Sequence, residues 1–394
     1  MFERVPSAPP DPILGLSAAF AADDRSHKIS LGVGEYRDAS GKTPVLDVVR
    51  AAEARLLAAG SSKTYLPIDG TPAYGRLVRE LVFGQDRADS ADTVTVQTPG
   101  GTGALRVAAD FIANHFPDAR IWLPDPTWAN HPKIFEAARV PCLSYRYYNS
   151  EAKGLDAPGM LEALQQTEKG DVVLLHACCH NPSGVDLDAD TWQAAGKLLA
   201  DRGALALVDF AYQGFGDGLE QDAAGLRLFC EQVPEMFVAT SYSKNFGLYQ
   251  DRVGALTVVT GSADRAETVL SQLKICVRTS FSNPPAHGSA LVTCILSDEG
   301  LRADWRAELT QMRERINGMR QTLVEGLQRH GGSQDFSFIT RQKGMFSFSG
   351  LDPKQVERLR EEHAVYIVGS GRINVAGVTP DNVDALCRAV VSVL

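Results

Sequence analysis

Short apolar segments alternate with longer helical patterns through the middle of the chain. The segments are rich in valine, isoleucine and leucine, and they lie at 93–97, 120–124, 171–176, 204–210, 236–240 and 253–259. Strands that are apolar on both faces and separated by helices are typical of a mostly parallel sheet covered on two sides. The pattern therefore predicts an α/β domain in the middle of the chain.

The pattern changes in the last third of the chain. A long charged amphipathic stretch runs from Leu301 to His330 and ends at two glycines. As one continuous helix it would extend about 40 Å, which is long enough to bridge two domains. Short apolar segments around a predicted helix at 353–363 indicate a small α+β unit. The Pro-rich residues 6–12 favour an extended arm.

Composition narrows the class of protein. The chain has 394 residues, is 44% apolar and includes 35 glycines. A chain of this size and composition is too large for one compact core, so we expect two domains. The net charge of −9, with no basic block, argues against nucleic acid or an anionic membrane surface as partner. We therefore expect a small-molecule ligand.

The cysteines and the N-terminal residues indicate the cellular compartment of the protein. Seven cysteines include the adjacent pair Cys178 and Cys179, without a repeated CxxC spacing. This usage indicates reduced thiols and neither a disulfide framework nor a zinc site, so no metal is predicted. The first residues lack the features of a signal peptide, and no run reaches the roughly 18 apolar residues of a membrane helix. We expect a soluble cytoplasmic protein.

A glycine-rich turn follows the first predicted strand. In "TPGGTGALR", Gly100, Gly101 and Gly103 open a helix. Glycines let backbone N–H groups approach an anion, Thr102 adds a hydroxyl, and a helix N-terminus favours negative charge, so the turn suits a phosphate. A tight turn that needs glycine only for its geometry is the alternative. A dinucleotide site is disfavoured, because Arg106 stands at the third glycine of GxGxxG.

Two further strand ends carry polar side chains. Asp209 ends the segment at 204–210, and Tyr212 follows it. A carboxylate at the edge of an apolar sheet is costly unless it is paired, so we expect a cationic partner, although a helix-capping aspartate also fits. The "HNPSG" segment at 180–184 offers Asn181 as a hydrogen-bonding amide beside Pro182, and by itself it is only a turn.

Lys244 has unusual neighbours for a lysine. It lies in "TSYSKNFGLYQDR", directly after an apolar segment and among hydroxyl and aromatic groups. Partial loss of hydration lowers the pKa of a lysine and makes its neutral amine a nucleophile for carbonyls. A surface lysine is the default alternative. Together, the glycine turn, the acidic strand end and the lysine indicate pyridoxal phosphate, whose phosphate, ring nitrogen and aldehyde need these groups.

The chain resembles the class I pyridoxal-phosphate aminotransferases of the aspartate/aromatic branch. The resemblance rests on "TPGGTGALR", "CCHNPSG", "DFAYQGF", "SYSKNFGLY", "SNPPAHG" and "GMFSFSG", and it runs from residue 11 to residue 382. It implies fold type I, with a large domain built on a mostly parallel seven-stranded sheet covered by helices, and a smaller α+β domain. The expected bounds are an arm at 1–12, a large domain at 44–311, and a small domain from 13–43 and 312–394.

The resemblance also implies roles for individual residues. Lys244 would form the internal aldimine and move the proton between Cα and C4′. Asp209 would pair with the pyridine nitrogen, with His131 and His176 behind it, although either histidine could instead be an ordinary core residue. The other expected cofactor contacts are Trp128 on the ring, Asn181 and Tyr212 on the phenolic oxygen, and Gly101, Thr102, Ser241, Ser243 and Arg252 on the phosphate.

Substrate recognition is implied in the same way. Arg372 would clamp the α-carboxylate in a planar two-bond geometry, and Arg278 would pair with the side-chain carboxylate of aspartate or glutamate. Arg278 and Tyr65 would come from the neighbouring subunit of a homodimer, with Tyr65 near the cofactor and the reacting groups. Gly34 would lie beside the substrate carboxylate. Trp128 and Asn181 would border the substrate as well as the cofactor.

Some residues depart from the family pattern. Glu35 stands where a small apolar residue is common, and its carboxylate could disfavour acidic substrates or point to solvent. Thr64 replaces an asparagine frequent in aspartate-preferring relatives, whereas Thr43, Thr102 and Asn283 are aspartate-like. The sequence therefore leaves aspartate and aromatic preference open.

The expected activity is ping-pong transamination between an L-amino acid, namely aspartate, glutamate or an aromatic amino acid, and a 2-oxo acid such as 2-oxoglutarate. One alternative has aromatic amino acids as the main substrates. A pyridoxal-phosphate lyase or decarboxylase is disfavoured, because two carboxylate-binding arginines suit a dicarboxylate transaminase. Rivals of other classes are a cofactor-binding sensor without turnover and a nucleotide-dependent dehydrogenase that uses the glycine turn.

Overall fold

The computed structural model describes residues 1–7, 13–332 and 334–394 and divides into two compact units. The small unit consists of Met1–Thr43, Pro182–Gly184 and Arg315–Leu394, and the large unit consists of Pro44–Asn181 and Val185–Glu314. The boundary between Glu314 and Arg315 falls within helix α11 (Glu299–Arg329), which confirms the long helix predicted at 301–330. The predicted arm at 1–12 includes residues 8–12, which lie outside the described residues.

A seven-stranded sheet forms the centre of the large unit. The strand order is β2 (Thr93–Pro99), β10 (Val253–Thr260), β9 (Glu235–Ser241), β8 (Leu205–Phe210), β7 (Val172–His176), β3 (Ile121–Asp125) and β4 (Cys142–Arg146). Only β10 runs antiparallel to its neighbours in this sheet; the other pairs are parallel. The predicted mostly parallel sheet of seven strands is confirmed.

The burial of the strands explains which of them the sequence revealed. Every residue of β7 is buried, and so is all of β8 except its first residue, so both strands read as continuous apolar runs. The edge strand β4 exposes Leu143, Ser144 and Arg146. Because an edge strand needs no continuous apolar run, β4 was absent from the predicted segments.

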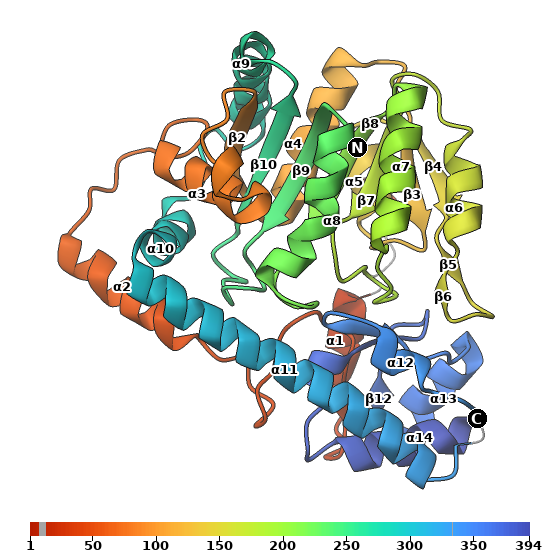
Figure 1. Ribbon diagram of the computed structural model, residues 1–394. Coiled ribbons are helices and arrows are strands. Elements are labelled where there is room, and N and C mark those ends of the chain that lie inside the picture. The colour runs from red at the N-terminus through yellow and green to blue at the C-terminus, as the bar shows by residue number, and fades with distance from the viewer. Residues whose placement is uncertain (8–12, 333) are drawn as a thin grey trace. The chain divides into compact units, whose positions relative to one another are not determined.

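Helices cover both faces of this sheet. Figure 1 shows α7 (Ala189–Arg202) and α8 (Leu219–Gln232) in front of the sheet and α4 (Gly100–His115) behind it. One buried cluster joins Ala104 and Ala108 of α4 to strand residues such as Leu207 and Ala239. The other elements are α2 (Asp47–Ala59), α3 (Pro72–Phe83), α5 (His131–Ala137), α6 (Ala157–Leu164), α9 (Ala263–Ser280), α10 (Ala286–Ser297), β5 (Tyr148–Asn149) and β6 (Gly154–Leu155).

The small unit combines helices with two short strand pairs. Strand β1 (Ile29–Ser30) pairs in parallel with β12 (Val365–Tyr366), and β11 (Phe346–Phe348) pairs antiparallel with β13 (Arg372–Asn374). Helix α13 (Pro353–His363) matches its predicted range, and a capping box between Asp352 and Gln355 fixes its start. The remaining helices are α1 (Leu14–Ala22), α12 (Phe338–Arg341) and α14 (Val383–Val393). The predicted small α+β domain is confirmed.

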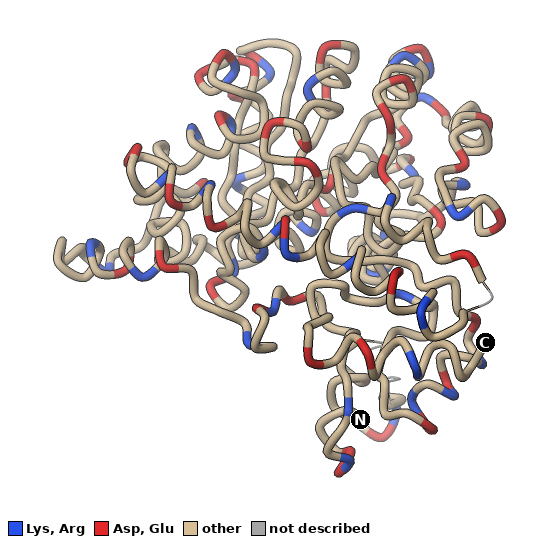
Figure 2. The backbone as a smooth tube through the Cα atoms, turned by 60° about the horizontal axis from the view of Figure 1, so that its bottom comes forward, with Lys and Arg blue, Asp and Glu red and all other residues tan. Residues whose placement is uncertain are grey.

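The surface charge and the cysteines fit the composition. Figure 2 shows Lys and Arg interspersed with Asp and Glu along the backbone. All seven cysteines have free thiols. Among the helices of the described residues, none has the length and apolar character needed to cross a membrane.

Candidate active site

The carboxyl ends of the parallel strands bring the predicted residues to one edge of the sheet. Asp209 on β8 lies opposite His176 on β7. On the other side, Gly254 of β10 pairs with both Ser241 of β9 and Thr98 of β2. The glycine turn after β2, the lysine loop after β9 and the start of β10 therefore meet at this edge, where open α/β sheets bind their ligands.

A cavity of about 200 Å³ lies at this edge within the large unit. Among the predicted residues, it is lined by Gly101, Thr102, Trp128, His176, Asn181, Asp209, Tyr212, Ser241, Ser243, Lys244 and Arg252. Leu105 and Ala211 also line it. Sequence reasoning missed these two, because an apolar residue has no signal of its own beyond its place beside a predicted ligand.

One end of the cavity suits an anion. Ser241 Oγ donates to Ser243 Oγ at 3.2 Å, and Arg252 Nη1 donates to the same Ser243 oxygen at 3.4 Å. No side chain among the described residues caps the N-terminus of α4, which begins here, so its first N–H groups remain available to a ligand. A Cβ on Gly100 would lie 2.6 Å from Arg252 Nη2. Glycine at position 100 therefore keeps this end open.

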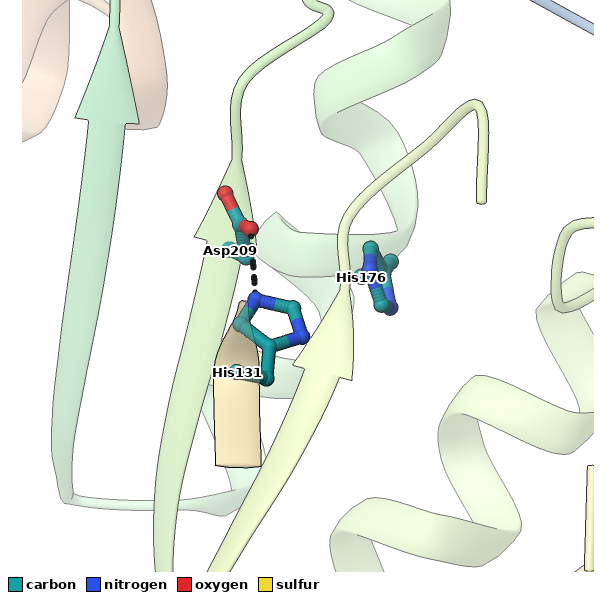
Figure 3. Close-up of side chains that lie close together, drawn as sticks. All are labelled: His131, His176 and Asp209. Carbon is teal, nitrogen blue, oxygen red and sulfur yellow. Dashed lines mark hydrogen bonds and ion pairs between the residues drawn. The ribbon is translucent and has the colours of Figure 1, made fainter. Parts of the chain in front are cut away.

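The other end carries a buried carboxylate. His131 Nε2 lies 3.0 Å from Asp209 Oδ2, and His131 Nδ1 lies 2.7 Å from Thr127 Oγ1. Figure 3 shows the His131 ring facing Asp209, with His176 at the end of the neighbouring strand. Thr127 was not predicted, and its signal is its position four residues before His131, just ahead of the helix that His131 begins.

The charges at this end follow from burial and pairing. Burial alone raises the pKa of Asp209, but the hydrogen bond to His131 and nearby positive charge, including that of Lys244, outweigh it, so the pKa is lowered overall. Burial also lowers the pKa of His176 to about 3. Asp209 is therefore ionised and His176 neutral near pH 7.

Lys244 lies between the two ends. Its Nζ is 5.4 Å from the centroid of the Tyr212 ring. Burial, opposed by the negative charge of Asp209 and assisted by the positive charge of Arg252, lowers the pKa of Lys244 to about 8. A substantial fraction of the amine is therefore neutral near pH 8, as a nucleophile for carbonyls requires.

Two predicted residues of the large unit lie outside the cavity. Tyr65 is 91% exposed, between α2 and α3, and Arg278 is exposed in the last turn of α9, where it donates to Ser282 Oγ. Asn283 Nδ2 donates to Leu66 O at 2.7 Å, which holds the Tyr65 segment beside the end of α9. The structure thus brings Tyr65 and Arg278 to one region of the surface of this unit.

The remaining predicted residues belong to the small unit. Arg372, on β13, is 4% exposed, and its Nη2 donates to Gly32 O at 2.5 Å. Gly34 lies two residues after that carbonyl. The backbone oxygen of Glu35 accepts a hydrogen bond from Asn374 Nδ2 at 2.8 Å. Position 35 is therefore fixed through its backbone, and its half-buried side chain is not part of this contact.

The residues in the cavity fit the predicted cofactor. Hydroxyls, the open helix N-terminus and Arg252 suit a phosphate, and the ionised Asp209 suits a protonated ring nitrogen. The Lys244 amine between them suits an aldehyde. Glycine at position 100 agrees with this fit, because a Cβ there would collide with the Arg252 guanidinium that the phosphate needs.

Comparison with known proteins points to one family. The model of the family described as aminotransferase class I and II matches residues 26–390. Aspartate aminotransferase from Salmonella typhi is 53% identical, with all of both chains covered. Aromatic-amino-acid aminotransferase from Pseudomonas aeruginosa is 47% identical and covers all of this chain and 98% of its own.

A solved structure agrees with these relatives. The aromatic-amino-acid aminotransferase from Burkholderia pseudomallei, covalently bound to pyridoxal phosphate, superposes with a TM-score of 0.97 at 47% identity. The superposition covers 100% of this chain and 99% of the other.

Proposed function

Because this chain belongs to the aminotransferase class I and II family, we propose that it is a pyridoxal-phosphate-dependent transaminase. It transfers an amino group from an L-amino acid, in a ping-pong reaction, to a 2-oxo acid such as 2-oxoglutarate. The single observation that carries this proposal is the cavity in which Lys244 stands between the ionised Asp209 and the anion end formed by Ser241, Ser243 and Arg252.

The residues around the cavity divide the work of the reaction. When bound, the cofactor supplies an aldehyde and a ring that stabilises negative charge on the substrate Cα. Arg252 and the two serines would hold its phosphate, and the ionised Asp209 would favour a proton on the ring nitrogen. Lys244 Nζ takes and returns a proton at the substrate, which a pKa of about 8 allows in both directions. Trp128 would orient the ring, and Asn181 and Tyr212 would hydrogen-bond to its phenolic side.

Two arginines select the substrate. Arg372 binds the α-carboxylate present in every amino acid and 2-oxo acid of the cycle, and Arg278 binds a side-chain carboxylate. We propose aspartate and glutamate as the main amino acids. Aromatic amino acids are the alternative, because a relative named for them covers this chain at 47% identity, against 53% for one named for aspartate. Both arginines are present, which disfavours a lyase or decarboxylase.

We also propose a homodimer with shared active sites. Tyr65 and Arg278 lie outside the cavity of their own unit and close together at its surface, which suits residues that serve a second copy. Two apolar side chains near these residues in the sequence are also exposed: Leu57 of α2 is 85% exposed, and Ile275, on α9 like Arg278, is 54% exposed. A cytoplasmic location fits the seven free thiols.

Steady-state kinetics test this function. We expect kcat/KM with 2-oxoglutarate to be higher for aspartate and glutamate than for phenylalanine and tyrosine. A reversed order would establish the aromatic alternative. In the absence of an oxo acid, L-aspartate should convert the visible spectrum of the enzyme to that of the pyridoxamine form. Full turnover by Lys244→Ala would overturn the proposed mechanism, and tight NADH binding without a covalent chromophore would favour a dehydrogenase.

A further inference from the structure

Arg372 and Phe346 share one face of the strand pair in the small unit. The register of β11 and β13 places Phe348 opposite Arg372, and Phe346 opposite Asn374. Residues two apart on a strand point to the same face, so Phe346 is the diagonal neighbour of Arg372. The guanidinium carbon of Arg372 lies 4.2 Å from the Phe346 ring centroid. Because both side chains are buried, the attraction between cation and ring is poorly screened by water.

A second arginine fixes the backbone that carries the ring. Arg320 of α11 is buried, and its Nη2 donates to Phe346 O at 2.9 Å and to Gly344 O at 2.5 Å. Its Nη1 donates to Ile339 O at 3.3 Å and to Ser347 Oγ. These four hydrogen bonds from one buried guanidinium hold β11 in place. Through them, helix α11 fixes the backbone that carries the Phe346 ring.

The far end of the ring meets Gly34. A Cβ at position 34 would lie 2.6 Å from Phe346 Cζ, closer than real Cβ contacts come. The segment cannot easily move away, because Asn374 Nδ2 donates to Val33 O at 2.7 Å and to Glu35 O at 2.8 Å. Position 34 is therefore glycine because the Phe346 ring occupies the space that a Cβ would need.

The orientation of Arg372 depends on these contacts. The ring lies against the guanidinium, and Gly32 O accepts from Nη2 at 2.5 Å. Together they set the plane of the guanidinium and its rotation about the side chain. A two-bond contact with a carboxylate tolerates little error in either, because guanidinium and carboxylate must be coplanar.

We propose that Phe346 is a positioning residue for the α-carboxylate, acting through Arg372, and that residue 34 is glycine to admit the Phe346 ring. This inference rests on the proposed function, in which Arg372 binds that carboxylate. Every substrate of both half-reactions carries it, so a weaker clamp affects all of them alike. The contact exists before and during the reaction, so KM changes more than kcat.

Graded fluorination of the ring tests the cation contact in the holoenzyme. Phenylalanine 346 is replaced by its 4-fluoro, 3,5-difluoro and 3,4,5-trifluoro analogues, which weaken the ring quadrupole at nearly constant volume. We expect the Kd of succinate, a non-reacting dicarboxylate, and the KM values for aspartate, phenylalanine and 2-oxoglutarate to rise with each fluorine, reaching about tenfold. The control is the same series at Phe336, a buried residue of the same unit whose ring packs on Phe338.

A glycine variant tests the steric part. Gly34→Ala should raise the same constants at least about fivefold, and its effect should be smaller when Phe346→Leu is already present, because the shorter side chain leaves space. Gly369→Ala is the matched control, since its added Cβ would have no atom of the described residues within 4 Å apart from those of its chain neighbours. Effects of Gly34→Ala and Phe346→Leu that simply multiply would overturn the steric link.

The outcomes separate this inference from the proposed function. If the wild-type holoenzyme does not transaminate, or if Arg372→Lys binds succinate as tightly as the wild type, the proposed function fails and the inference fails with it. A flat fluorination series at residue 346 in an active enzyme that loses succinate on Arg372→Lys overturns the role of Phe346 alone.

Discussion

His131 Nε2 lies 3.0 Å from Asp209 Oδ2, and both side chains are buried. A buried carboxylate that loses its partner keeps the cost of desolvation without the compensating hydrogen bond. We therefore expect His131→Leu to lower the free energy of unfolding of the cofactor-free protein by about 3 kcal/mol, as measured by urea unfolding. Thr127→Val, which removes the single hydrogen bond between the Thr127 hydroxyl and His131 Nδ1, should cost only about 1 kcal/mol.

A double variant shows whether the lone charge is the cause. Replacing both partners, with His131→Leu and Asp209→Leu together, removes the uncompensated carboxylate and should restore most of the lost stability. If the double variant is no more stable than His131→Leu, the loss comes from packing of the imidazole and the interpretation of the pair is wrong.

Lys244 should titrate near pH 8, because burial lowers its pKa to about that value. In the cofactor-free protein, acylation of Lys244 followed by peptide mass spectrometry should therefore rise with a midpoint near pH 8. Arg252→Gln removes a neighbouring positive charge and should move the midpoint up. Asp209→Asn removes a negative charge and should move it down. The exposed Lys354 corrects for reagent decay. A midpoint above pH 10, or shifts of opposite sign, would contradict the assigned causes.

The fold was largely predictable because burial imposes period and composition on the chain. Strands β7 and β8 are covered on both faces, and both appeared as apolar runs within one residue of their observed bounds. The ends of such strands also indicated where Asp209, Asn181 and Lys244 lie, since the carboxyl ends of parallel strands meet at one edge of the sheet, where ligands bind. The edge strand β4 escaped because its exposed residues carry no such pattern.

The partners of the site residues were less accessible to sequence reasoning. Asp209 and His131 are separated by 78 residues, and Phe346 and Gly34 meet from segments far apart in the chain. A local pattern indicates which face of a helix or strand a residue occupies. It does not indicate which residue from a distant part of the chain will contact it. Arg320 shows this most clearly, because in the sequence it is one more charge of an amphipathic helix, whereas in the fold it is buried beneath β11.

Arg278 should matter in proportion to the charge on the substrate side chain. We expect Arg278→Ala to lower kcat/KM for aspartate about a hundredfold, because a charged hydrogen-bonded pair is lost. For phenylalanine, which offers no carboxylate there, the loss should stay within about threefold. Arg265→Ala, at the other end of α9 in an exposed pair with Glu235, serves as control. Equal losses for the two substrates would remove Arg278 from side-chain recognition.

Mixing two inactive variants tests whether the sites are shared between subunits. Lys244→Ala abolishes the amine, and Arg278→Ala impairs aspartate binding. If Arg278 serves the partner's cavity, a heterodimer of the two variants has one site with both defects and one with neither. Random reassortment makes half of the dimers mixed, so aspartate activity should recover to about a quarter of the wild-type value. If Arg278 serves the cavity of its own chain, every site carries one defect and mixing restores nothing.

Light scattering on the same samples checks that the species are dimers, and a monomer with full activity would refute the shared site outright.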